Sequence, residues 1–384
     1  MLRWDRLIEL ARGEGTEESR DIVRLTTKFE EGSAQPEEIL ELAEHLLKGK
    51  NPKKGEKVLM ELMASPALDE ELLAEACELL EQVGSYELAL KGYEKIRTIA
   101  PRKALPVYRM GRLLEIQGRL EEAIRFHKKA IELEADNPEC WYRLGVAYTK
   151  NHQYEEAEGR YRKAIDLDPT HSKSYTNLGY ILDLQGKRES ALLQFRKAVQ
   201  HNPKSAEAHF NLGALYGEEG DRDQAIKEFR IGLEIDTTSI EGHYNLGLAL
   251  VNEGRLGDAE EEFKRILKLE HDNVNALFYL GFLHYRRGVY GKALKHLQHA
   301  SRLNPGNTTI LYYVGECYNK LEQPQKALEY YRRVTEINPA DSKVYFSLGV
   351  IYEKQDDKRR ASEYYRLAAL KAHEETQGGT RVVE

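Results

Sequence analysis

The sequence of 384 residues predicts an all-α fold, a tandem array of antiparallel helix pairs. One glycine returns every 34 residues at eight consecutive places, which are Gly111, Gly145, Gly179, Gly213, Gly247, Gly281, Gly315 and Gly349. An alanine keeps the same interval twelve residues later, at Ala123, Ala157, Ala191, Ala225, Ala259, Ala293, Ala327 and Ala361. A period of this length holds two helices of three to four turns and two short turns.

The apolar positions of each repeat lie at helical spacing. If the repeats are numbered so that the glycine is position 8, positions 4, 7, 8 and 11 share one face of a first helix, and positions 20, 24, 27 and 28 share one face of a second. In one repeat these residues are Trp141, Leu144, Gly145 and Tyr148, followed by Ala157, Tyr161, Ala164 and Ile165. The small residues at positions 8 and 20 are expected where the two helix axes come closest.

Turn residues mark where both helices end. Position 15 is glycine in five repeats, as a left-handed residue after a helix requires, at Gly118, Gly186, Gly220, Gly254 and Gly288. Four prolines follow the second helix, which they cannot continue, at Pro169, Pro203, Pro305 and Pro339.

These residues give the chain a family resemblance. The pattern of Trp141, Leu144, Gly145, Tyr148, Ala157, Tyr161, Ala164 and Pro169 resembles the tetratricopeptide repeat, and the match covers residues 104–375. The departures are His209 and His243 at position 4, and Gly232, Ile266 and Val334 at position 27. The resemblance implies a right-handed superhelical solenoid whose first helices line a concave groove. The resemblance does not imply an enzyme.

The chain before and after the eight repeats is less regular. Residues 1–35 are expected to form an N-terminal helical hairpin cap, and residues 36–103 two divergent helix pairs of the same kind. Residues 104–375 form the eight consecutive repeats, and residues 376–384 are expected to be a disordered tail. This organisation predicts ten helix pairs after the cap.

Composition excludes several classes of function. A net charge of −7 without a basic stripe argues against a nucleic-acid platform. No apolar run approaches the length of a membrane span, so we expect no direct membrane insertion. The first residues of the chain are too charged for a signal peptide, which favours a cytoplasmic protein.

Motifs of catalysis and metal binding are missing from the sequence. Cys77, Cys140 and Cys317 lie in separate repeats, so no CxxC pair or disulfide framework exists. No phosphate-binding loop, nucleophile elbow or HExxH motif occurs. His284, His296 and His299 share a repeat, but no cysteine or carboxylate cluster completes a ligand set for them. The sequence therefore predicts no enzyme, no cofactor and no metal.

The functional surface is expected on the concave face, which the resemblance assigns to positions 2, 5, 6, 9, 12 and 13 of the first helices. Position 5 is aromatic in seven repeats, at Tyr108, Tyr142, Phe210, Tyr244, Phe278, Tyr312 and Phe346. Position 6 gives Arg109, Arg143, Asn177, Asn211 and Asn245 in succession. An asparagine amide both donates and accepts hydrogen bonds, so these asparagines can hold the backbone of an extended peptide. The pattern resembles the asparagine ladders of tetratricopeptide superhelices that hold extended polypeptide.

Other interpretations of the residues on this face are also possible. The family consensus alone explains an asparagine at position 6 and an aromatic at position 5. No three consecutive repeats supply the lysines, asparagines and arginine of a clamp for two carboxylates. Arg286, Lys320 and Lys354 at position 13 form a basic edge that could meet an acidic partner, although solvated charge also explains them.

The sequence thus predicts a non-enzymatic scaffold or adaptor that binds a protein or an extended peptide segment. Three alternatives remain open. The chain could be a targeting or accessory subunit for an enzyme on another chain, a self-assembling scaffold, or an RNA-reading repeat protein, which the acidic balance disfavours.

Overall fold

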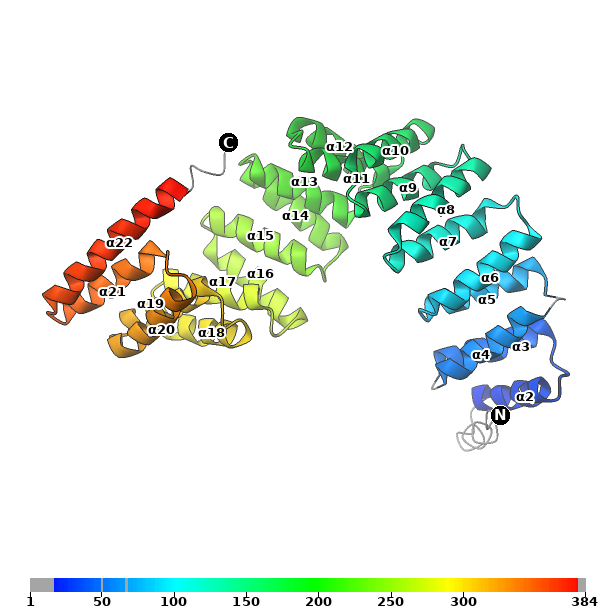
Figure 1. The fold of residues 1–384 in the computed structure, drawn as a ribbon, viewed down its shortest axis with the longest axis horizontal. Coiled ribbons are helices and arrows are strands. Elements are labelled where there is room, and N and C mark those ends of the chain that lie inside the picture. Colours follow the sequence, from blue (N-terminus) through cyan, green and yellow to red (C-terminus); the bar gives the residue numbers. More distant parts are fainter. Residues whose placement is uncertain (1–16, 50, 66–67, 379–384) are drawn as a thin grey trace. The chain divides into compact units, whose positions relative to one another are not determined.

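The structure, a computed structural model, describes residues 17–49, 51–65 and 68–378, and every regular element in these ranges is an α-helix (Figure 1). The chain divides into two compact units, Met1–His201 and Asn202–Glu384. The helices of the first unit are α2 (Glu17–Glu30), α3 (Pro36–Lys48), α4 (Pro52–Ala64), α5 (Glu70–Gln82), α6 (Tyr86–Ile99), α7 (Ala104–Ile116), α8 (Leu120–Leu133), α9 (Pro138–Lys150), α10 (Tyr154–Leu167), α11 (Ser172–Leu184) and α12 (Arg188–His201). Those of the second unit are α13 (Ala206–Glu218), α14 (Arg222–Ile235), α15 (Ile240–Asn252), α16 (Leu256–Leu269), α17 (Val274–Arg286), α18 (Tyr290–Leu303), α19 (Thr308–Lys320), α20 (Pro324–Ile337), α21 (Ser342–Lys354) and α22 (Lys358–Gly378).

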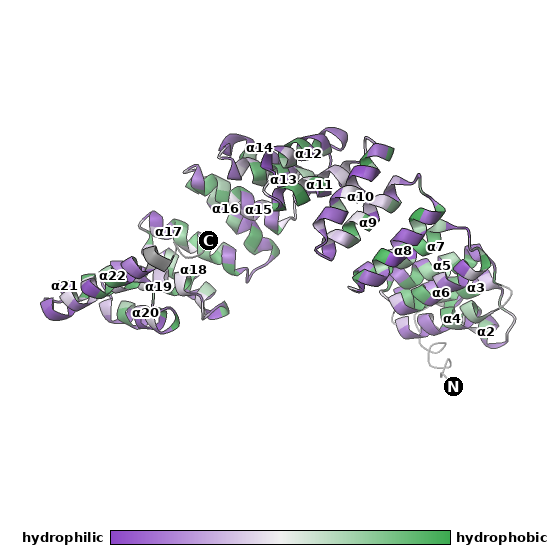
Figure 2. Cartoon of the chain, turned by 45° about the horizontal axis from the view of Figure 1, so that its top comes forward, coloured by the Kyte–Doolittle hydropathy of each residue, from purple (hydrophilic) through white to green (hydrophobic). Residues whose placement is uncertain are grey.

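Consecutive helices pack as pairs, from α3 with α4 to α21 with α22. Within each unit the second helix of a pair also contacts the first helix of the next pair, as α8 contacts α9 and α14 contacts α15. The labelled helices carry both hydrophobic and hydrophilic residues, as amphipathic helices do (Figure 2). The predicted all-α array of helix pairs is confirmed.

Side-chain caps begin many of the first helices. The side chain at the N-cap accepts a hydrogen bond from a backbone N–H of the first turn at Asn137, Ser205, Ser239, Asn273, Asn307 and Asp341. In α9 the residue that follows this cap is Pro138, whose missing N–H costs nothing in the first turn. These caps explain why the helices begin at the same point of successive repeats.

The repeated glycine at position 8 makes room for the large residue at position 24. A Cβ placed on Gly145 would lie 2.6 Å from Cε1 of Tyr161, and one on Gly315 would lie 2.5 Å from Cε1 of Tyr331. Both tyrosine side chains are fully buried. Glycine is therefore needed because a ring of the second helix packs directly on the backbone of the first.

The turn inside each pair needs a residue with positive φ. All five predicted glycines adopt it, with φ between 72° at Gly186 and 84° at Gly220. After α7, the N–H of Arg119 donates to the Leu114 carbonyl and that of Gly118 donates to the Glu115 carbonyl, which together form a Schellman motif. Three repeats place other residues in this conformation, at His152, Glu322 and Asp356.

The side chain at position 4 bonds the backbone six residues earlier. Trp141 Nε1 donates to the Ala135 carbonyl over 2.7 Å, and the Tyr175 hydroxyl donates to the Pro169 carbonyl over 3.2 Å. His209 replaces the aromatic residue there and still reaches the Pro203 carbonyl through Nε2, at 3.1 Å. The two departures His209 and His243 thus preserve the same contact.

Helices α2 and α22 lie at the expected boundaries of the N-terminal cap and of the last repeat. Helix α2, the second half of the expected cap, contacts α3, and the first half lies outside the described residues. Helix α22 continues to Gly378, three residues past the expected end of the last repeat, and the rest of the expected tail is also outside them. No helix in the described part of the chain is both long and apolar enough to span a membrane.

Candidate functional site

The first helices of the pairs form one layer in each unit. Helix α7 contacts α9 and α9 contacts α11 in the first unit, while α13 contacts α15, α17 contacts α19 and α19 contacts α21 in the second. Among the described residues, no two second helices are in comparable contact. The first helices of neighbouring repeats therefore approach one another more closely than the second helices do, as expected of helices that line the inner side of a curved array. Every residue proposed from the sequence for the groove lies on these helices.

The two arginines at position 6 are held by carboxylates. Arg109 in α7 pairs with Glu78 at 2.9 Å and with Glu81 at 3.4 Å, both on α5. Arg143 in α9 pairs with Glu139 of the same helix at 3.0 Å. The cationic groups in this part of the layer therefore already have acidic partners within the chain.

Glu139 links two first helices. Its carboxylate accepts a hydrogen bond from the Tyr108 hydroxyl at 3.1 Å and lies 3.3 Å from His171 Nε2. Burial opposes ionisation of this carboxyl, but the bonds from His171, Arg143 and Tyr108 outweigh burial and lower its pKa to about 2. At neutral pH Glu139 is thus a charged group that ties the Tyr108 hydroxyl to the next repeat.

Asn177 in α11 is oriented by its own neighbours. Its side-chain nitrogen donates to the hydroxyl of Tyr161 over 3.2 Å, and the same hydroxyl lies 2.9 Å from Oγ1 of Thr149. The Asn177 side chain is half-buried. Its carbonyl oxygen has no hydrogen-bond partner in the described part of the chain, so the acceptor of this amide is available and fixed in direction.

Asn211 in α13 and Asn245 in α15 have amides that are entirely unpaired. Both side chains are half-buried, and neither makes a hydrogen bond to any described residue. The two helices are in contact, and the asparagines occupy the same position of successive repeats. Each amide can therefore donate and accept one repeat apart on the same layer.

The aromatic side chains at position 5 pack mainly between repeats. Tyr142 is only 9% exposed, Phe346 is 57% exposed, and the other five are half-buried. The ring of Phe210 shows why: a Cβ on Gly232 would lie 2.4 Å from it, and one on Gly242 would lie 2.6 Å from it. Two small residues make space for this ring, so only its remaining edge is open to a partner.

Sequence reasoning missed an aromatic cluster on α17 and α19. Phe282 lies 6.1 Å from Phe278 and 5.2 Å from Tyr313, measured between ring centroids, and Phe278 lies 5.9 Å from Tyr313. All three side chains are half-buried. The available signal was the change at position 6 from asparagine to tyrosine, and the phenylalanine at position 9. We call Phe278, Phe282 and Tyr313 the aromatic cluster.

The predicted basic edge consists of exposed side chains in the last turn of α17, α19 and α21. None of Arg286, Lys320 and Lys354 pairs with a carboxylate among the described residues, and a cation at a helix C-terminus is favoured by the helix dipole. The Arg286 guanidinium lies 5.9 Å from the Phe282 ring centroid, which joins the basic edge to the aromatic cluster.

The cysteines offer no reactive thiolate. All three are free and buried, and burial raises the pKa of Cys140 to about 11 and those of Cys77 and Cys317 to about 12. The histidines are arranged differently from the sequence grouping: His284 stacks on His296 at 5.7 Å, whereas His299 turns to His271 and Asp272.

Three family models match the chain. They are described as the middle TPR-like domain of cilia and flagella-associated protein 70, over residues 109–231, subunit 3 of the anaphase-promoting complex or cyclosome, over 252–334, and the tetratricopeptide repeat, over 342–369. All three models are tetratricopeptide families or contain such repeats. No curated protein sequence matches the chain significantly.

Solved structures with helical repeats are similar to parts of the chain. MamA is 26% identical over 43% of this chain and 97% of its own, with a TM-score of 0.41. PilF of Pseudomonas aeruginosa is 19% identical over 58% of this chain and 97% of its own, with a TM-score of 0.48. The Cut9-Hcn1 hetero-tetramer of the anaphase-promoting complex includes a chain that is 14% identical over 88% of this chain and 64% of its own, also with a TM-score of 0.48.

Proposed function

The chain belongs to the tetratricopeptide repeat family, whose members generally act as protein–protein interaction scaffolds, and we propose that it holds an extended peptide segment of a partner protein on its layer of first helices. The chain performs no chemistry of its own in this proposal. A cytoplasmic location, expected from the sequence, is part of the same proposal.

One observation carries the proposal: the unpaired amides of Asn211 and Asn245, one repeat apart on the contacting helices α13 and α15. A half-buried amide without a partner loses hydrogen bonds to water and gains none from the chain. An extended peptide backbone presents N–H and C=O groups that can satisfy both amides whatever its side chains are. Asn177 offers the same chemistry in the first unit, where Tyr161 fixes its direction.

Two surface features of the second unit indicate which side chains the bound peptide would carry. The aromatic cluster offers ring edges and faces for an apolar or aromatic side chain. Arg286, Lys320 and Lys354 have no carboxylate partner among the described residues, so an acidic side chain would meet uncompensated positive charge there. We therefore propose a segment in which an apolar anchor lies near acidic residues.

A peptide-display selection on the full chain tests this proposal. Peptides selected by the natural chain should contain an aromatic or large apolar residue near acidic residues. Selection should lose enrichment with the chain that carries Asn211→Ala and Asn245→Ala and keep it with Asn304→Ala, an exposed asparagine after α18. Equal enrichment by all three chains would contradict the proposal and direct attention to other surfaces.

A second candidate function, self-association, is favoured by one apolar hollow of about 650 Å³ formed by the last two repeats. Tyr312, Phe346, Tyr365 and Ala368 line it, and Phe346 is 57% exposed. Sedimentation velocity at rising concentration tests this candidate. A dimer that Phe346→Ser abolishes would support it, and a monomer at all concentrations would exclude it.

A further inference from the structure

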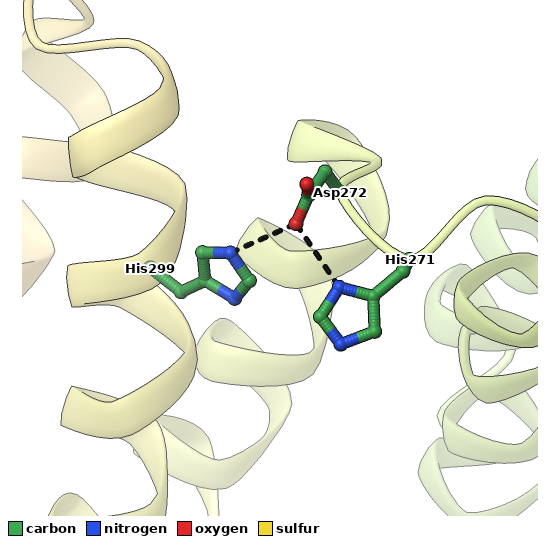
Figure 3. Close-up of side chains that lie close together, drawn as sticks. All are labelled: His271, Asp272 and His299. Atoms are coloured by element: carbon green, nitrogen blue, oxygen red, sulfur yellow. Dashed lines mark hydrogen bonds and ion pairs between the residues drawn. The ribbon is translucent and has the colours of Figure 1, made fainter.

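Three potential metal ligands come together on the second unit. His271 and Asp272 lie in the loop between α16 and α17, and His299 lies on α18 (Figure 3). Asp272 Oδ1 is 3.0 Å from Nδ1 of His271 and 3.0 Å from Nε2 of His299. The three ligand atoms all lie within 4.8 Å of one another. No other three side chains of the metal-binding types come as close in the described part of the chain.

The donor set suits a divalent transition metal. Imidazole nitrogen and carboxylate oxygen are common ligands of zinc, which lies about 2.0–2.2 Å from each of them. Tetrahedral coordination at that length separates neighbouring ligand atoms by roughly 3.4 Å. The two distances from Asp272 Oδ1, 3.0 Å each, are slightly shorter than this value, so each imidazole needs only a small outward movement from Asp272 to admit an ion.

The backbone on both sides of the cluster is anchored. Asn273, next to Asp272, caps α17 by accepting from the N–H of Ala276, and its amide donates to Glu270. Helix α18 is fixed by Leu297 and Ala300, which are fully buried. The Asp272 and His299 backbones are therefore held at a set separation, while His271, with a side chain 85% exposed, is free to adjust.

Two of the three positions depart from the pattern of the other repeats. His271 occupies position 32, which is proline at Pro169, Pro203, Pro305 and Pro339. His299 occupies position 26, which is cationic at Lys129, Lys163, Lys197, Arg265 and Arg333. A lysine or arginine at that position would repel a metal ion, and a neutral imidazole binds one. The helical fold itself requires neither histidine, because the other repeats form without them.

We propose that His271, Asp272 and His299 bind one divalent transition metal ion, with zinc as the reference ion and water in the remaining position. The ion replaces the contacts of both imidazoles with Asp272 and clips the loop before α17 to α18. The sequence analysis considered His284, His296 and His299 together because they share a repeat. It missed this site because the site joins the loop of one repeat to the second helix of the next.

Isothermal titration of the chelator-treated full chain with zinc chloride tests the proposal. Saturable binding of one ion is expected, with affinity lowered at least about tenfold by His299→Gln and by Asp272→Asn, which keeps the shape of the side chain but removes its charge. The control His373→Gln changes an exposed histidine on α22 and should leave the affinity unchanged. Circular dichroism checks that each variant is folded.

Thermal unfolding supplies a second measurement, which does not depend on the heat of zinc binding. Zinc should raise the midpoint of the natural chain and of His373→Gln, and should not raise that of His299→Gln or of His271→Gln. The absence of saturable binding, or equal zinc affinity and equal midpoint shifts in all variants, would overturn the proposal.

Discussion

The side-chain amide of Asn177 donates a hydrogen bond to the hydroxyl of Tyr161, 3.2 Å away. The bond joins α11 to α10 and therefore one repeat to the preceding one. Tyr161 is fully buried against Gly145, so the residue that orients the half-buried amide of Asn177 is itself fixed by the core. Packing inside one repeat thus sets the direction of a polar group on the layer proposed to bind peptide.

Replacing Tyr161 with phenylalanine should destabilise the chain by about 1–2 kcal/mol, because it removes the contacts of the hydroxyl with Asn177 and Thr149. The midpoint of urea unfolding measures the effect. Tyr180→Phe is the matched control, since the Tyr180 side chain is 47% exposed on α11. Equal midpoints for the two variants would show that the buried hydroxyl contributes nothing.

Two glycines of one repeat should respond to alanine with opposite signs. Gly145→Ala should cost about 1–3 kcal/mol, because the new methyl group would lie 2.6 Å from the buried Tyr161 ring. Gly159→Ala should stabilise the chain by about 0.5–1 kcal/mol, because nothing lies within 4 Å of a Cβ there and alanine favours the helix. Chemical denaturation compares the two variants, and a loss of stability in both would contradict the packing assigned to position 8.

The turn between α19 and α20 should be improved by glycine. Glu322 has a φ of 56°, which costs a residue with a side chain about 1–2 kcal/mol relative to glycine. Glu322→Gly should therefore raise the thermal midpoint. Gly288→Ala, at a φ of 75° in the equivalent turn, should lower it. A lower midpoint for Glu322→Gly would mean that its side chain contributes more than the strain costs.

Protonation of the stacked pair His284 and His296 should destabilise the second unit. Burial lowers the pKa of both side chains below the ordinary value of 6.5, and the charge of His284 lowers that of His296 further. Below pH 6.5 the unfolded chain therefore binds protons that the folded chain does not. The stabilisation is complete above pH 6.5 and declines as the pH falls through the lowered values.

Urea unfolding at pH 7.5 and 5.5 measures this effect. The loss of stability between the two values should be smaller for His296→Gln than for the natural chain, because the variant has one fewer group to protonate. The variant His373→Gln, which changes a histidine exposed on α22 and outside the stacked pair, is measured beside it for comparison. If His296→Gln lost as much stability between pH 7.5 and 5.5 as the natural chain, this histidine pair would not be a cause of the pH dependence.

The periodic features of the fold could be predicted from the sequence because each recurs at a fixed place. Gly118 and Gly288 take the left-handed turn, and Pro169 and Pro305 follow helices that end at Leu167 and Leu303. A 34-residue repeat specifies these local conformations many times over.

Contacts between repeats were harder to predict. The aromatic rings at position 5 were expected to line a groove, but Tyr142 is 9% exposed, and the rings of Tyr161 and His171 pack against it. Phe282 and Tyr313 are 5.2 Å apart although they come from different repeats, and Asp272 reaches His299 in the same way. Such pairs depend on how side chains of adjacent helices interlock, which the spacing within one repeat does not specify.

The affinity of the Asn211→Ala and Asn245→Ala double variant for a display-selected peptide tests the central claim most directly. Fluorescence anisotropy with the labelled peptide gives the dissociation constant. Each lost hydrogen bond is worth about 0.5–1.5 kcal/mol, so binding should weaken roughly five- to 150-fold. Folding should be unaffected because neither side chain bonds a described residue, and Asn304→Ala should bind as the natural chain does. A folded double variant with the natural dissociation constant would contradict the claim that these amides hold the peptide backbone.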